Sequence, residues 1–354
     1  MGIQTQNPQH TESYHLFGAS SSPGCANYGL KHFASQNQIQ YPSAASFIRN
    51  NFYVDDGIIS LESVDEAVKL VKEAQVVCAK GNLHLHKFLS NNREVLDSIC
   101  ASERAAEVKN VDLNHDELPA QRVLGIRWNV ESDSFSFKVS LDEKPATRRG
   151  ILSVVASLYD PLGFLAPFIL EGKRVLQEMC RKGTGWDEPL PSELKLRWES
   201  WMNDLENLEK IQIPRCFTPK HFGEILSVEL HHFSDASSQG YGQCSYVRLV
   251  GKENIHCAFV MGKARVAPTK IVTIPRLELT AAVTSAAVSS MLKEELVLGY
   301  INNEARRFHV FVANRVQRIR EATNPGQWFY VETGENPADH ASRGLKVADL
   351  ISSN

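Results

Sequence analysis

The sequence predicts an α+β/α/β chain, and three patterns along it lead to this fold class. Residues 52–59 are typical of a short apolar strand, a tight acidic turn and a second strand. Residues 151–208 carry apolar side chains at helical spacing. Residues 230–261 return to the alternation of strands, and an alanine-rich helix follows from Ile274. We therefore predict domains at 1–140, 141–222 and 223–345, and a tail at 346–354.

Two adjacent acids stand at the first of these turns. Asp55 and Asp56 follow the aromatic pair Phe52-Tyr53 and Val54, and Gly57 comes next. Carboxylate oxygens are ligands that Mg²⁺ prefers, and paired metal ions can stabilise both oxygens of an in-line phosphoryl displacement. Asp-Gly is also a strong signal for an ordinary hairpin turn. Both interpretations stay open on these residues alone.

The motifs of the first region resemble a reverse transcriptase of the BEL/Pao retrotransposons. Tyr53–Asp56 is similar to the hairpin motif of the polymerase palm, and Phe17–Ala26 is similar to the segment before it. Gly81–Phe88 resembles the palm segment whose lysine is proposed to protonate the pyrophosphate leaving group, which implies that role for Lys87. Val123–Trp128 resembles the primer-gripping hairpin. The resemblance implies a partial reverse transcriptase palm in residues 1–140.

The same resemblance implies that Asp55 and Asp56 are catalytic ligands of Mg²⁺, and it also shows a defect. A palm needs a third carboxylate from an earlier strand, but no Asp precedes Asp55, and the only Glu there is Glu12. About 50 residues precede the hairpin, which is too few for the fingers and the first half of a palm. We therefore predict no DNA synthesis by this chain alone.

Two smaller features of the first region can be tested by a structure. Ser63 and Glu66 form a capping box, which predicts a helix that ends at Gly81. His84 and His86 alternate on a predicted strand. Solvent-facing strand positions explain these histidines better than a metal site, since no other ligands stand nearby in the sequence.

The middle region, 141–222, predicts a helical thumb or connection. The first helix starts near Thr147 and stops at Asp160-Pro161, because proline and the glycine after it make continuation costly. Tyr159–Gly163 also resembles the connection region of BEL/Pao elements. A third helix, with Ser192 as its cap, carries the tryptophans on an apolar stripe, so we expect core packing rather than base stacking.

The third region contains three acids in an order that resembles the ribonuclease H of the same elements. Asp235 lies on the first strand of a predicted hairpin, Glu278 lies early in the long helix, and Asp339 follows a strand predicted at Trp328–Glu332. In that family four such acids hold two Mg²⁺ ions, which activate water and stabilise the leaving oxygen. The resemblance implies a mixed sheet with helices and implies that Asp235, Glu278 and Asp339 are catalytic metal ligands.

The fourth acid of that family is missing. No aspartate occurs between Glu278 and Asp339, and Leu296 runs directly into Val297, where the family has a further strand. We interpret this as a deletion of about a dozen residues, the length of a strand and its turn. Loss of a central strand would leave unpaired backbone groups, so we expect the strand near Phe329 to pair directly with the one near Phe233. Glu294 or Glu295 is a weaker candidate for the missing ligand.

Composition restricts the remaining possibilities. The chain has 354 residues, of which 43% are hydrophobic and 22% charged, and a formal net charge of −3. No run approaches the roughly 20 apolar residues of a membrane span, no secretory signal is visible, and seven cysteines without a Cys-x-x-Cys pair argue for reduced thiols and against zinc. We expect an intracellular protein, in the cytoplasm or nucleus, without a membrane partner.

Any nucleic-acid surface must be local at this net charge. The densest basic run has arginines at 306, 307, 315, 318 and 320 with apolar residues between them, which suits a helix with a basic side. This side could contact a phosphate backbone or could be a solvated face, and the two readings stay open. An aspartic protease is disfavoured, since Asp235-Ala236-Ser237 lacks the glycine of that turn.

Two hypotheses about function follow. The first is a pol-derived reverse transcriptase/ribonuclease H fragment, whose ancestral partners are an RNA–DNA hybrid or a template-primer and which could work beside an intact pol copy. Its chemistry would be impaired by the missing ligands, with Mg²⁺ as the ancestral cofactor. The second is a non-catalytic module that binds nucleic acid or protein. A trimmed gene model at Leu296-Val297 is a third explanation of the gap, which transcript sequencing would reveal.

Overall fold

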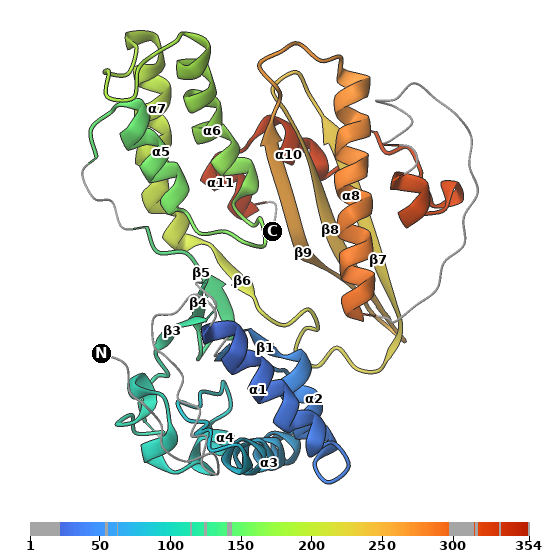
Figure 1. The fold of residues 1–354 in the computed structure, drawn as a ribbon. Helices are drawn as coiled ribbons and strands as arrows, with labels where there is room; N and C mark the ends of the chain where they lie inside the picture. Colours follow the sequence, from blue (N-terminus) through green and yellow to red (C-terminus); the bar gives the residue numbers. More distant parts are fainter. Residues whose placement is uncertain are drawn as a thin grey trace, which may run out of the picture. The chain divides into compact units, whose positions relative to one another are not determined.

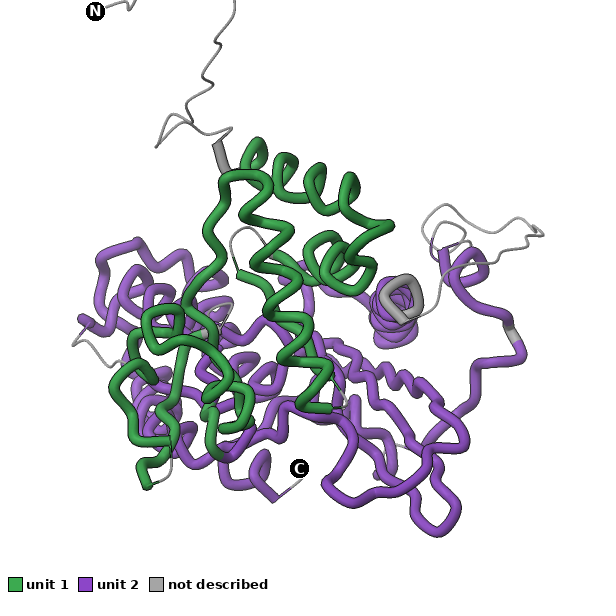
Figure 2. The backbone as a smooth tube through the Cα atoms, turned by 90° about the horizontal axis from the view of Figure 1, so that it is seen from below, with its two compact units in different colours: residues 1–124, 129–131 green, residues 125–128, 132–354 purple. Residues whose placement is uncertain are grey.

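The chain folds into two compact units. The structure is a computed structural model, and it describes residues 22–53, 56–61, 63–113, 115–123, 126–139, 144–296, 315, 318–332 and 334–352 (Figure 1). The first unit contains residues 1–124 and 129–131, and the second contains residues 125–128 and 132–354 (Figure 2). The predicted regions 141–222 and 223–345 share the second unit.

The first unit is built on three helices and a small hairpin. Its helices pack around a buried cluster that includes Ala34, Ile48, Leu70 and Val77. The elements of this unit, in chain order, are α1 (Ser22–Gln36), α2 (Pro42–Asn50), β1 (Phe52–Tyr53), β2 (Asp56–Gly57), α3 (Val64–Lys80), α4 (Arg93–Asp97), η1 (Ala101–Glu103), η2 (Ala106–Val108) and β3 (Ala120–Val123).

Two local predictions for this unit are confirmed. The side chain of Ser63 accepts a hydrogen bond from the backbone N–H of Glu66, 3.3 Å away, and α3 ends with Gly81 as its C-cap. β1 and β2 pair antiparallel, with Tyr53 opposite Asp56. The strand predicted through His84 and His86 is wrong, because residues 83–87 form no strand. Asn82 and Lys87 both take left-handed φ values, 54° and 62°, which interrupt extended backbone at each end of this segment.

The second unit begins with strands and a helical layer. Strand β4 (Ile126–Asn129) lies at the boundary of the two units, and β5 pairs antiparallel with β6. The further elements of this layer are β5 (Ser134–Ser136), α5 (Arg148–Ser157), α6 (Ala166–Arg181), α7 (Ser192–Leu205), η3 (Glu206–Lys210) and β6 (Gln212–Pro214). Thr147 caps α5, whereas Ser192 is the first residue of α7 and Pro191 is its N-cap, so the cap predicted at Ser192 is wrong.

The tryptophans of α7 belong to the core, as predicted. Trp201 stacks on Phe168 of α6, with ring centroids 4.9 Å apart, and its indole N–H donates to the Phe168 carbonyl. Trp198 stacks on Trp201 in turn. Both side chains are buried in a cluster that also holds residues of α5, α11 and β6. They are therefore unavailable for base stacking.

The loop between α5 and α6 is held by a buried carboxylate. Asp160 accepts hydrogen bonds from the backbone N–H groups of Phe164 (2.9 Å) and Leu165 (2.7 Å), directly before α6 begins. The loop also reaches β9, because the N–H of Gly262 donates to the Leu162 carbonyl at 2.8 Å. Burial raises the pKa of Asp160 to about 6, and the backbone hydrogen bonds act in the opposite direction.

The second unit ends with a three-stranded antiparallel sheet between helices. The strand order is β7-β8-β9, and α8 packs on β7 and β8, while α10 and α6 pack on the opposite face (Figure 1). The elements are β7 (Ile225–Ala236), β8 (Gly240–Gly251), β9 (Ile255–Val266), α8 (Ile274–Leu296), η4 (Pro325–Gln327), α10 (Ala338–Arg343) and α11 (Val347–Ser352). The predicted hairpin at Asp235 and the long helix from Ile274 are confirmed.

The strand predicted at Trp328–Glu332 is wrong. These residues form no strand, and Phe329 and Tyr330 are 82% and 88% exposed. The indole N–H of Trp328 donates to the Thr323 hydroxyl at 2.8 Å, which holds the segment against its own preceding turn. The expected pairing of this segment with the strand near Phe233 is therefore wrong too. Among the described residues β7 pairs only with β8, and the sheet is antiparallel rather than mixed.

Two further findings concern membrane spans among the described helices and the state of the cysteines. None of the described helices has the length and apolar character needed to cross a membrane. All seven cysteines are free thiols.

Candidate active site

Asp235 lies near the end of β7, on the sheet face that α10 covers. Its partner across the ladder is Gly242 of β8. A Cβ at Gly242 would stand 2.6 Å from the Cβ of Ala341, so the missing side chain lets α10 approach the sheet closely. The sequence therefore places Asp235 under the short helix that carries Asp339.

Ser342 joins the two aspartates. Its hydroxyl lies 2.6 Å from Oδ2 of Asp235 and 3.0 Å from the backbone carbonyl of Asp339. Ser342 is fully buried, and Ser237 donates to its backbone carbonyl at 2.8 Å. A hydroxyl has one proton, and the shorter contact to the carboxylate is the stronger one. The structure thus ties Asp235 to the helix of Asp339 by a buried hydrogen bond.

The Asp339 carboxylate is paired with Arg343, one helical turn later. The distance from Nε of Arg343 to Oδ1 of Asp339 is 2.6 Å. The hydrogen bond to Asp339 and the charges of Asp339 and Asp235 together raise the pKa of Arg343. A cation is therefore already paired with Asp339 and also interacts with the charge of Asp235.

Asn336 fixes the start of α10. Its amide nitrogen donates to the carbonyl of Ser234 at 3.2 Å, and its amide oxygen accepts from the N–H of Ala338 at 3.0 Å. One side chain therefore fastens the helix to the strand residue next to Asp235. The motif Asn336–His340 has a positioning role that its sequence did not reveal.

Glu278 lies on the other side of the sheet. Successive strand residues point to opposite faces, and Ala236 forms a buried cluster with Leu277 of α8, while the neighbouring Asp235 contacts α10. The side chain of Glu278 is exposed on α8. Within the part of the chain that the structure describes, no group of three His, Cys, Asp or Glu side chains could hold a metal ion. The structure brings Asp235 and Asp339 together and leaves Glu278 apart.

The remaining residues predicted for the polymerase site lie in the first unit. Asp56 is exposed on β2, and Asp55 lies outside the described residues. Lys87 is exposed in the irregular segment after α3. The catalytic roles of Asp55, Asp56 and Lys87 stay predictions.

His84 and His86 form a stacked, solvent-exposed pair. Their ring centroids are 5.2 Å apart, and Nε2 of His84 lies 3.0 Å from the Glu103 carboxylate. The exposure of both rings agrees with the solvent-facing positions predicted for these histidines.

Two contributors to the site were not among the residues predicted from sequence. Arg343 follows Asp339 at the i,i+4 spacing of a helical acid–base pair, a signal that could have found it. Ser342 has no such signal, because its role depends on which face of the strand α10 covers. Of the alternative ligands, Glu294 and Glu295 have helical backbone, and their side chains lie outside the described part.

Comparison with known families now gives the class of protein. Residues 147–308 match the family model of the Pao retrotransposon-like RNaseH-like domain. This range includes the helical layer from the cap of α5, the sheet, Asp235 and Glu278, and it stops before Asp339. The chain therefore carries an RNase H-like domain.

The same match supports a protein derived from a BEL/Pao pol polyprotein. No curated protein matches the chain.

Proposed function

We propose that this chain is a reverse transcriptase/ribonuclease H fragment of a BEL/Pao pol polyprotein that binds nucleic acid inside the cell, with its nuclease activity lost or severely reduced. The observation that carries the proposal is the division of the acids. Asp235 and Asp339 share one face of the sheet, while Glu278 belongs to the helix on the other face.

The acids do not provide the donor set that two Mg²⁺ ions need. Octahedral magnesium takes several oxygen ligands at short distance, and two-metal hydrolysis needs a clamp on both the attacking and the leaving oxygen. One oxygen of Asp235 is bonded to Ser342, and one oxygen of Asp339 is bonded to Arg343. The resemblance to the family implies Mg²⁺ as the ancestral cofactor, and the described residues of this chain do not fit a pair of these ions.

Hydrolysis of an RNA–DNA hybrid tests this proposal. The purified 354-residue chain is incubated with a labelled hybrid and Mg²⁺ beside an Asp235→Asn variant, and binding is measured on the same hybrid. We expect binding by both proteins and at most weak cleavage that depends on Asp235. Robust cleavage by the natural chain that disappears in the variant would overturn the proposal.

The polymerase half is tested by primer extension. A template-primer with deoxynucleotides and Mg²⁺ should give no extension by this chain alone, because only the late part of a palm precedes the helical region. Extension that is lost in an Asp56→Asn variant would contradict this part of the proposal.

A second candidate function is a non-catalytic module that binds nucleic acid or protein. It is favoured by the use of both acids in structural contacts, since Asp235 holds α10 through Ser342, and Asp339 pairs with Arg343 within α10. The assay above separates the two candidates. Residual cleavage sensitive to Asp235 favours an impaired nuclease, and binding without any cleavage favours the module.

A further inference from the structure

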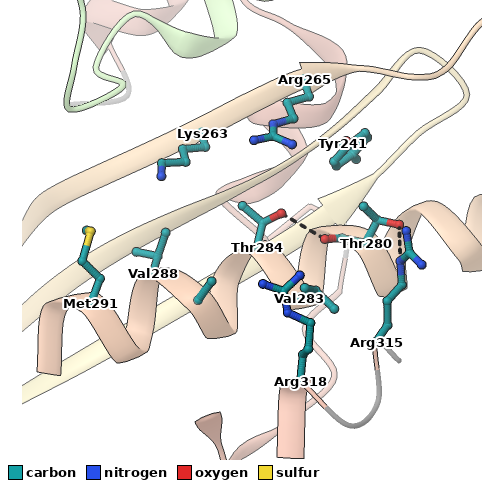
Figure 3. Close-up of a pocket in the computed structure, with 11 residues that line it drawn as sticks. Tyr241, Lys263, Arg265, Thr280, Val283, Thr284, Val288, Met291, Arg315 and Arg318 are labelled. Carbon is teal, nitrogen blue, oxygen red and sulfur yellow. Dashed lines mark hydrogen bonds between the residues drawn. The ribbon is translucent and has the colours of Figure 1, made fainter. Parts of the chain in front are cut away.

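A basic groove lies on the α8 face of the sheet, away from the aspartate pair. Its volume is about 740 Å³, and Lys263, Arg265, Arg315 and Arg318 all line it (Figure 3). None of its eleven lining residues is acidic. Four like charges around one hollow repel one another, and an anion between them relieves that repulsion.

The strand register explains why two of these cations face the groove. Lys263 pairs with Gln243 and Arg265 pairs with Tyr241, so the side chains of both β9 residues lie on one face. Gln243 is fully buried on that face. Helix α8 packs mainly on β7 and β8, which leaves room beside it over β9. Figure 3 shows Lys263, Arg265 and Tyr241 directed toward α8 across this space.

The other two cations come from the segment after the long helix. Nε of Arg315 donates to the hydroxyl of Thr280 on α8 at 3.3 Å, which directs this guanidinium along the helix. Arg318 lies three residues further along the chain. Figure 3 shows this pair next to α8, and all four cations line the same hollow. Positive charge is therefore spread along the groove rather than concentrated at one point.

We propose that this groove binds the phosphate backbone of a nucleic-acid strand. Arginine forks and lysine ammonium groups are the usual phosphate partners, and the Tyr241 ring offers a surface on which a base can stack. A hollow of about 740 Å³ with cations on both sides can hold a ligand with several phosphates. The inference rests on the proposed binding of nucleic acid and adds where the strand lies, on the face opposite Asp235.

Salt-dependent binding by the full chain tests the groove. Fluorescence anisotropy with a labelled single-stranded oligonucleotide and with a labelled RNA–DNA hybrid is measured from 50 to 200 mM salt, as suits phosphate contacts. The groove variants are Lys263→Gln with Arg265→Gln, and Arg318→Gln. The matched control is Lys252→Gln, a lysine of the β8–β9 turn outside the groove lining.

We expect the double variant to weaken binding about tenfold and to reduce the slope of log K against log salt by about 2, since two phosphate contacts are lost. The Arg318→Gln variant should reduce the slope by about 1, and the control should change neither quantity. Circular dichroism confirms that the variants fold.

The outcomes separate this inference from the proposed function. A natural chain that binds neither probe would overturn the proposed function and the groove together. Binding that is unchanged in all groove variants would overturn the groove alone. Displacement of the oligonucleotide by a free nucleoside triphosphate at equal phosphate concentration would show a small-molecule pocket instead and would also overturn the inference.

Discussion

The two faces of the β7-β8-β9 sheet differ in charge and in what covers them. On one face the short helix α10 lies close to the strands and is held by the Asp235 carboxylate through Ser342, while its own Asp339 pairs with Arg343 of the same helix. On the other face α8 leaves a groove lined by four cations. In our account the Asp235 carboxylate on the first face serves as a structural anchor for α10, while the second face keeps the charge that phosphates need.

The largest effect is expected from a substitution that separates α10 from the sheet face of Asp235. Gly242→Ala would place a Cβ 2.6 Å from the Cβ of Ala341 and 2.7 Å from the carbonyl of Lys263. We expect a loss of about 3 kcal/mol in the free energy of unfolding, measured by urea denaturation. The control is Gly326→Ala, where the nearest atom is 3.9 Å away. Equal stability of the two variants would show that α10 does not pack closely on β8.

The second effect is a pH dependence of the free energy of unfolding, and it comes from Asp160 in the loop directly before α6. The pKa of Asp160 is raised to about 6 in the folded chain, above its usual value of 3.8, so the folded state binds the proton more tightly than the unfolded state. Its contribution to stability is present at pH 4 and is lost as the pH rises through about 6. Compared with Asp160→Asn, the natural chain should lose on the order of 2 kcal/mol between pH 4 and pH 7. If the difference in free energy of unfolding between the two proteins stays constant across this range, burial of this carboxylate is contradicted. The same holds if the natural chain becomes more stable relative to the variant as the pH rises.

The third effect measures how much the Ser342 hydroxyl contributes to the free energy of unfolding. Ser342→Ala removes the buried hydroxyl that reaches Asp235, and we expect the free energy of unfolding to fall by about 1–2 kcal/mol, as for hydrogen bonds to charged groups. Asp235→Asn keeps an acceptor at that position and should cost less. Chemical denaturation of both variants checks this order, and the reverse order would mean that the carboxylate charge, not the hydroxyl, holds α10.

The smallest effect concerns Arg343, whose side chain is 59% exposed. Because exposed ion pairs contribute little, Arg343→Gln should change the free energy of unfolding by less than about 1 kcal/mol. The same denaturation series measures it. A loss comparable to that of Gly242→Ala would show that this ion pair within α10 is a main source of the stability of that helix.

Local sequence signals predicted part of this fold. The capping box of Ser63, the hairpin at Tyr53 and Asp56, and the apolar stripe with Trp198 and Trp201 all depend on neighbours in the chain, and the structure confirms them. The segment at Trp328 shows the limit of such signals. Its run of aromatic and β-branched residues favours a strand, but a strand needs a partner edge, and the bond from Trp328 to Thr323 keeps the segment against its own preceding turn.

The sequence predicted which acids could form the site, but it did not predict how the fold groups them. Asp235, Glu278 and Asp339 stand in the family order, but their grouping depends on which face of the sheet each helix covers. The spacing of residues along the chain does not contain that information. The groove was hidden for the same reason, because Lys263 and Arg265 become one surface with Arg315 and Arg318 only after β9 and α8 are placed.

Metal counting tests the division of the acids most directly. Mn²⁺ can replace Mg²⁺ at oxygen sites, and its electron paramagnetic resonance signal reports free ion as it is titrated into the full chain with a bound hybrid. We predict that Asp235→Asn and the natural chain bind the same number of ions, because the natural chain holds no metal pair at Asp235. Two ions bound per natural chain, and lost in the variant, would contradict the account.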